Sequence, residues 1–197
     1  MAVNSANLVL GPARLYVASS GAQEPPDSDV TPNGIDNPPD PDVWVDVGGT
    51  DGGITFEVDS TYTDLTVDQV IMAVGSRLTE IKMSAAAKLS EMTLDNFQVA
   101  LNQVGVAGSG DGFETLDIPV TSAGTQPTYA AVLIDGFAPY LATGPALRRI
   151  IIRKVLSQTK ASLAYDKKTQ QSFDCTFPAY FVSDTINPVH IVDQTAA

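Results

Sequence analysis

Apolar and polar residues alternate most regularly between residues 79 and 89. One side of this segment carries Ile81, Met83, Ala85, Ala87 and Leu89, and the other carries Glu80, Lys82, Ser84, Ala86 and Lys88. A period of two is typical of a strand with one buried and one wetted face. The composition favours a helix instead, because Ala, Lys, Met, Leu and Glu are good helix formers. We give the alternation more weight and predict a strand.

A helix pattern follows this strand directly. Thr93 is a good N-cap, Asp95 falls in the first turn, and Met92 can pack on Phe97 as a hydrophobic staple. Gly105 offers a C-terminal stop. The helix carries a broad apolar stripe, and we expect it to pack on the apolar face of the sheet through Leu94, Phe97 and Leu101.

Strand patterns cover much of the remaining chain. We predict a short pair at 8–10 and 14–18, strands at 54–59 and 61–72, a turn at Gly75-Ser76, strands at 113–120 and 147–155, a central strand at 129–134, and a hairpin of 160–165 with 171–177. In that hairpin Phe173, Cys175 and Phe177 should face inward. The whole chain, 1–197, is then a single mainly β domain, a β-sandwich or partly open barrel with one flanking helix.

Two glycine-rich stretches could suggest phosphate loops. Residues 48–53 (GGTDGG) and 108–112 (GSGDG) both lack a following Lys-Ser/Thr pair, and a strand pattern follows instead of a helix. We interpret the first as a tight turn. Neither predicts a nucleotide site.

Residues 19–42 form a Pro/Asp-rich segment that cannot bury a core, so we predict an exposed, mobile loop. Its aspartates could suggest calcium, but the spacing lacks the glycine at the sixth position and the closing Glu of an EF-hand. We therefore predict no metal site there. Residues 193–197 (DQTAA) should form a short polar tail.

The net charge of −12 makes ordinary nucleic-acid binding unfavourable. Acidic residues dominate up to residue 68, where Arg14 is the only basic residue, while most basic residues lie between 148 and 168. The two regions could be separate solvated faces. Alternatively, one subunit's acidic region could meet its neighbour's basic region in head-to-tail assembly. The candidates for such contacts between subunits are Asp27, Asp29, Asp40, Asp42, Arg148, Arg149, Arg153 and Lys154.

Residues suited to catalysis are sparse. Cys175 is the only cysteine, which excludes an internal disulfide and predicts a buried structural thiol. His190 is the only histidine and has no recognisable nucleophile partner, so we expect a surface or interface role. We predict no cofactor and no enzymatic activity. The N-terminus lacks a signal-peptide pattern, no apolar run has the length of a membrane span, and we expect folding in a reducing cytosol.

Four stretches, taken in order, carry a resemblance to a known family. They are VWVDVGGTDGGITFEVDSTYTDLTVDQ, the strand LTEIKMSAAAKL, the strand-to-helix join SEMTLDNFQVALNQVG and the C-terminal KKTQQSFDCTFPAYFVSD. Together the pattern resembles the major tail tube protein of long-tailed bacteriophages, over residues 43–184. The match is one of pattern and order rather than of an invariant motif.

The resemblance implies a sandwich-like fold whose inner sheets join edge to edge in hexameric rings. The rings would stack into a tube that carries DNA without specific binding, with tape-measure, tail-tip and terminator proteins as partners. The location would be the virion tail, assembled in the host bacterial cytoplasm without a membrane anchor. On this interpretation, the alternation identifies six candidates for side chains that face the lumen: Glu57, Asp59, Asp68, Glu80, Lys82 and Ser84. Lys82 and Lys88 would pair with carboxylates across strands.

Residues 19–42 and 60–76 are candidates for contacts between stacked rings. Two other interpretations stay open. One is the inner tube of a contractile tail or injection machine, which has the same broad architecture. The other is a monomeric β-sandwich module that binds calcium or carbohydrate through the Asp-rich loop.

Overall fold

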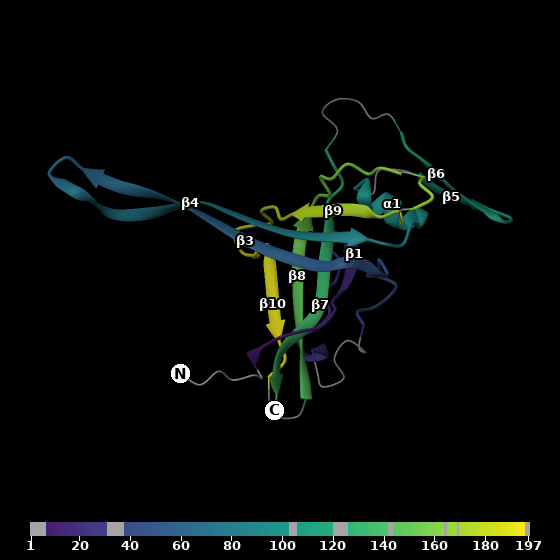
Figure 1. Ribbon diagram of the computed structural model, residues 1–197, viewed down its shortest axis with the longest axis horizontal. Helices are drawn as coiled ribbons and strands as arrows, with labels where there is room; N and C mark the ends of the chain where they lie inside the picture. The colour runs from purple at the N-terminus through teal and green to yellow at the C-terminus, as the bar shows by residue number, and fades with distance from the viewer. Residues whose placement is uncertain are drawn as a thin grey trace.

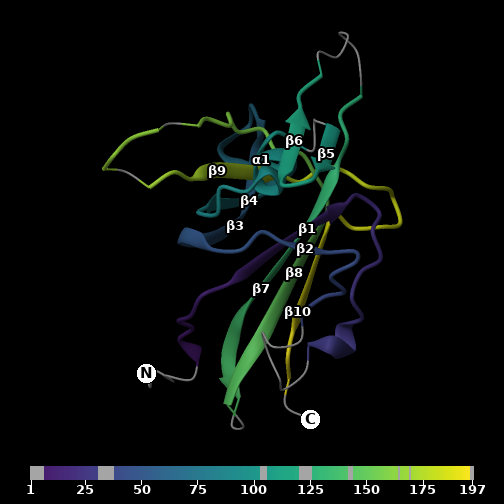
Figure 2. The same ribbon diagram turned by 90° about the vertical axis from the view of Figure 1, so that its right-hand side faces the viewer.

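The computed structural model describes residues 7–30, 38–102, 106–119, 126–141, 144–163, 165–168 and 170–195. Within them the chain is mainly β, with antiparallel sheets and a single α-helix, which confirms the predicted class. Two sheets are layered, and the smaller one crosses one end of the larger (Figures 1 and 2).

The larger sheet has five strands in the order β10-β8-β7-β1-β2. Its strands are β1 (Arg14–Ser19), β2 (Val45–Asp46), β7 (Ala130–Leu141), β8 (Gly144–Val155) and β10 (Val189–Asp193). β7 is central, as its continuous apolar run predicted. Residues 8–10 form no strand and are exposed, so the predicted entry pair is wrong; β1 pairs with β7 and β2 instead. The start of the predicted tail is also wrong, because Asp193 belongs to β10.

The smaller sheet has the order β3-β4-β9, with β3 at Thr50–Val67, β4 at Val70–Leu89 and β9 at Phe173–Pro178. The extended conformation predicted for residues 79–89 is confirmed as the second half of β4. The predicted turn at Gly75-Ser76 is wrong, since both residues lie inside β4 and the chain turns between Val67 and Val70. Residues 50–53 do not form a tight turn either: they begin β3, and Gly52 and Gly53, at φ of 78° and 87°, lie at a register shift in the pairing with β4.

β9 pairs with β4 rather than with residues 160–165, so the predicted C-terminal hairpin is wrong. Its side chains nonetheless face as expected, with Phe173, Cys175 and Phe177 all buried. A separate two-stranded sheet is formed by β5 (Val106–Gly110), which we did not predict, and β6 (Phe113–Asp117). It projects from the body beside the helix (Figure 1).

Helix α1 (Leu94–Ala100) begins as predicted, because the Thr93 hydroxyl accepts a hydrogen bond from the Asn96 amide at 3.1 Å. Phe97 stacks on Phe173 of β9 with ring centroids 5.3 Å apart, so the helix covers the sheet it has just left. Leu101 is half-buried, while Leu94 is exposed and lies toward the β5–β6 hairpin. The helix ends at Ala100, with Asn102 at φ 61°; the expected stop, Gly105, lies outside the described residues.

The main core lies between the two layered sheets. Leu15, Val132, Ile152, Leu89 and Phe177 are among its buried residues. A second apolar cluster on the other side of the large sheet contains Tyr16, Trp44, Leu133 and Ile151. The chain before Trp44 packs there, since the indole Nε1 donates to the carbonyl of Gln23 at 2.9 Å.

The described part of the predicted loop, residues 19–30 and 38–42, is therefore attached to the body. It includes a short 3-10 helix (Asp27–Asp29), and Val30 is buried. We predicted an exposed segment, and much of its side-chain surface is exposed. Residues 31–37 of this prediction lie outside the described residues.

Candidate functional site: an exposed β-hairpin arm

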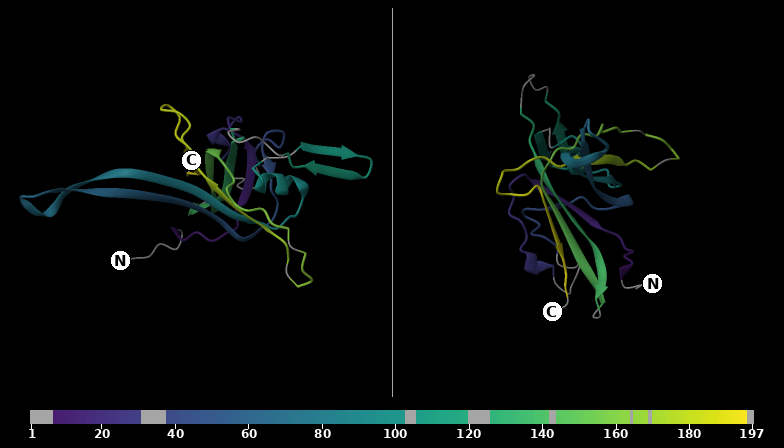
Figure 3. Two further views of the ribbon diagram at one scale, coloured as in Figure 1. Left: turned by 90° about the horizontal axis from the view of Figure 1, so that it is seen from above. Right: turned by 90° about the vertical axis from the view of Figure 1, so that its left-hand side faces the viewer.

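The most unusual feature of the molecule is the distal part of the β3–β4 hairpin, residues 57–82, which we call the arm. It extends far from the body as a two-stranded ribbon (Figures 1 and 3). Every residue in it is exposed. Its large apolar residues are Val58, Tyr62, Leu65, Val67, Val70, Ile71, Met72, Val74, Leu78 and Ile81.

The arm continues a surface that begins in the core. Along β4, Leu89, Ala87 and Ala85 are buried, Met83 is half-buried, and Ile81 is 50% exposed. These five residues alternate along one strand and therefore share one face. The apolar face of β4 that packs on the large sheet therefore continues outward along the arm, where no other described part of the chain covers it.

The opposite face of the same ribbon is polar. The register places Glu57 opposite Ser84, Asp59 opposite Lys82, and Glu80 opposite Thr61. Directly opposed residues share a face, so five of the six lumen candidates lie together. The sixth, Asp68, lies in the turn at the tip of the arm rather than along its strands, so the register does not place it on this face.

The two lysines of this strand both have carboxylate partners. Lys88 Nζ lies 2.7 Å from Asp51 Oδ2 on the neighbouring strand, as the cross-strand prediction required. This hydrogen bond raises the pKa of Lys88 and lowers the pKa of Asp51. Lys82 lies 3.1 Å from Glu80, which is on its own strand. The cations are therefore paired with carboxylates on an otherwise acidic face.

The basic residues of β8 have partners within the same chain. Arg149 forms a bidentate pair with Asp135, and both side chains are almost fully buried. Arg148 pairs with Asp193, which raises the pKa of Arg148 and lowers that of Asp193. The predicted contact of Arg149 with another subunit is thus wrong, because the side chain has no exposed surface to offer.

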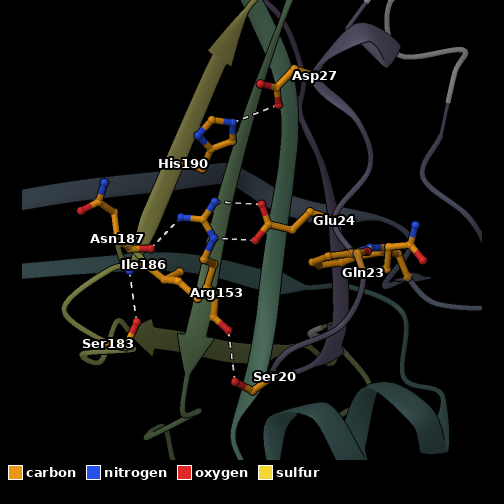
Figure 4. Close-up of polar contacts among 10 residues, drawn as sticks. Ser20, Gln23, Glu24, Asp27, Arg153, Ser183, Ile186, Asn187 and His190 are labelled. Atoms are coloured by element: carbon orange, nitrogen blue, oxygen red, sulfur yellow. Dashed lines mark hydrogen bonds and ion pairs between the residues drawn. The ribbon is translucent and has the colours of Figure 1, made fainter.

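The acidic loop does meet the basic strand, but inside one molecule. Figure 4 shows Arg153 between Glu24 and the backbone of Asn187, with His190 beside Asp27. Arg153 Nη2 lies 2.9 Å from Glu24 Oε2, and His190 Nε2 lies 3.0 Å from Asp27 Oδ1. These contacts join the loop to β8 and β10.

The remaining candidates for contacts between subunits are exposed or half-buried. Lys154 Nζ lies 4.4 Å above the ring of Tyr129. Asp40 and Asp42 are exposed, and the Asp40 carboxylate accepts a hydrogen bond from the Asp42 amide. Asp29 is half-buried in the 3-10 helix.

Cys175 is 2% exposed, and burial raises its pKa from 9.0 to about 12. We expect no reaction with a thiol reagent at pH 8 in the folded protein and one equivalent in denaturant.

Below pH 9 the Cys175 thiol has no effect on the pH dependence of stability. Above pH 9 the unfolded chain ionises first, so stability falls by about 1.4 kcal/mol per pH unit until the folded thiol also ionises. Urea unfolding of the wild type and Cys175→Ala at pH 8 and 10 measures this; equal pH dependence would contradict it.

The described part of the chain holds no group of three or more His, Cys, Asp or Glu residues placed to bind a metal ion. Among the same residues no helix is long and apolar enough to cross a membrane. No protein-family model matches the chain, and a search of curated proteins finds no matching sequence.

Sequence patterns missed the length of the arm and its apolar tip. One signal was present, because residues 70–74 (VIMAV) are apolar at positions that alternate between both faces of a strand. Such a run usually indicates a buried strand. Here it lies at the exposed end of a hairpin.

Proposed function

We propose that the chain is a structural subunit that assembles into stacked hexameric rings, forming the tail tube of a long-tailed bacteriophage. The tube would be the conduit through which genomic DNA leaves. The observation that carries the proposal is the arm, a two-stranded ribbon with ten large apolar residues exposed. We propose no enzymatic activity and no cofactor.

An isolated two-stranded ribbon is marginally stable in water. A concentration of exposed large apolar side chains of this kind is typical of an interaction site. At its base the arm has a polar face and an apolar face, and β3 is an edge strand of its sheet, as β10 is of the larger one. A neighbouring copy can supply both the missing hydrogen bonds and the cover for the apolar face.

In the proposed tube, the polar face of the arm's base lines the lumen. Glu57, Asp59 and Glu80 bring negative charge to it, and Lys82 is paired with Glu80. A wall of this kind repels the phosphate backbone, so DNA passes without being held. Apolar residues on the opposite face would pack outward against the ring.

Electron microscopy of the purified full-length chain tests the proposal. Rings or hollow tubes in negative stain, with a matching oligomer mass in solution, are the expected result. A monomer that persists at high concentration would contradict it. If its melting temperature also rose with calcium, a monomeric binding module would be supported instead.

Charge reversal by Glu57→Lys with Asp59→Lys should leave the tubes intact but make them retain DNA. The new lysines replace two repulsive contacts with attractive ones, and the retention should weaken as salt rises. Co-sedimentation of short double-stranded DNA with assembled tubes measures the effect. The control is Asp111→Lys with Glu114→Lys, which makes the same charge change on the exposed β5–β6 hairpin. Loss of assembly would instead place Glu57 and Asp59 in a subunit interface.

Two further proposals follow from the same function. The tube would contain a tape-measure protein during assembly, and it would end at tail-tip and terminator proteins. Its location would be the virion tail, after assembly in the bacterial cytoplasm. Particle images would separate a long non-contractile tail from the inner tube of a contractile one.

A further inference from the structure

We propose that the outer half of the arm docks onto a lysine-bearing segment of a second copy of this chain. We call residues 160–163, 165–168 and 170–172 the lysine segment. This inference rests on the proposed function, and it names the surface that receives the arm.

The charge of the arm is predominantly negative. It carries Glu57, Asp59, Asp64, Asp68 and Glu80 against two cations, Arg77 and Lys82. Lys82 is paired with Glu80. In the outer half, Asp64 and Asp68 flank apolar residues such as Ile71 and Met72, which are 107% and 76% exposed. A receiving surface should therefore offer both cations and apolar contacts.

The lysine segment has both properties. Lys160, Lys167 and Lys168 are exposed, and none of them has an ion pair within the described residues. Leu163 is 44% exposed and Tyr165 is 86% exposed. By contrast, residues 89–147, which include α1 and the β5–β6 hairpin, contain no lysine or arginine. That second projecting surface would repel the arm.

The placement of the two surfaces allows the contact to repeat. The arm leaves the body on one side, while the lysine segment leads into the start of β9 on the side away from the arm's tip (Figures 1 and 3). A contact between two different surfaces of the same chain is heterologous. Each added copy then presents a new arm and a new lysine segment.

Two complementary variants test the proposal. Lys167→Glu with Lys168→Glu reverses the receiving surface, and Asp64→Lys with Asp68→Lys reverses the arm. Each variant alone should need at least about ten-fold more protein to assemble than the wild type, measured by light scattering and negative-stain microscopy. All four side chains are exposed, and circular dichroism checks that both variants fold.

An equimolar mixture of the two variants should assemble again. In the mixture, each unaltered arm meets an unaltered lysine segment, and each reversed arm meets a reversed one. The lysine variant alone, at the same total protein concentration as the mixture, should give no such recovery. Variants that each assemble like the wild type, or a mixture that fails, would overturn the docking surface alone. A wild type that never assembles would overturn the proposed function as well.

Discussion

Replacing Ile71 and Met72 at the tip of the arm with aspartate is expected to abolish ring and tube assembly while leaving the chain folded. Both side chains are exposed in the single molecule, so the free energy of unfolding should change by no more than about 0.5 kcal/mol per substitution. Each side chain contributes roughly 1.5–3 kcal/mol when it is buried against a neighbour. Losing two buried side chains from each contact should raise its dissociation constant at least a hundred-fold.

Sedimentation or size-exclusion with light scattering measures the oligomer, and thermal unfolding measures the fold. The matched control is Val106→Asp with Phe113→Asp in the β5–β6 hairpin, where the side chains are 64% and 62% exposed. This control should assemble, because the proposed contacts do not use that hairpin. Wild-type assembly by the Ile71/Met72 variant would show that the tip is not an interface.

Replacing Arg149 with methionine is expected to lower the free energy of unfolding by about 3–5 kcal/mol. Arg149 Nε and Asp135 Oδ1 lie 2.7 Å apart in the core, with side chains 1% and 2% exposed. The substitution would leave the Asp135 carboxylate buried without its bidentate partner. Urea unfolding followed by circular dichroism provides the measurement.

Two further variants separate pairing from simple loss of charge. Arg148→Met should cost no more than about 1 kcal/mol, because its pair with Asp193 lies at the surface with side chains 40% and 38% exposed. The double variant Arg149→Met, Asp135→Leu should recover most of the lost stability, since apolar residues can replace a buried ion pair. Equal losses for Arg148→Met and Arg149→Met would contradict the assignment of Arg149 to the core.

The buried pair also explains why the charge pattern was misleading. The sequence shows a basic cluster and an acidic region far apart, which suggests contacts between subunits. In the fold, Glu24 and Arg153 are 129 positions apart and form a hydrogen-bonded pair. Charge patterning cannot distinguish a contact across one folded chain from a contact between two chains. Within this basic cluster, Lys160, Lys167 and Lys168 are the residues that stay exposed after the internal pairs form.

Local patterns predicted several elements correctly. The alternation at residues 81–89 gave the faces of β4, and Thr93 capped the helix, because both signals depend on residues close in sequence. The turn at Gly75-Ser76 failed because glycine and serine favour turns without requiring them. On the exposed ribbon Gly75 pairs opposite Leu65 within the strands. For the candidate site, alternation grouped five polar residues on one face but did not place Asp68.

The sequence by itself determined the β class, the buried and wetted faces of its central strands, and the position of the helix. Each of these follows from a short-range period of side-chain burial. Only the tertiary structure decided that β9 pairs with β4, that β10 borders β8, and that β3 and β4 extend into an arm. Backbone hydrogen bonds are alike for any pair of strands. Partners are therefore chosen by which apolar faces can be covered together in three dimensions.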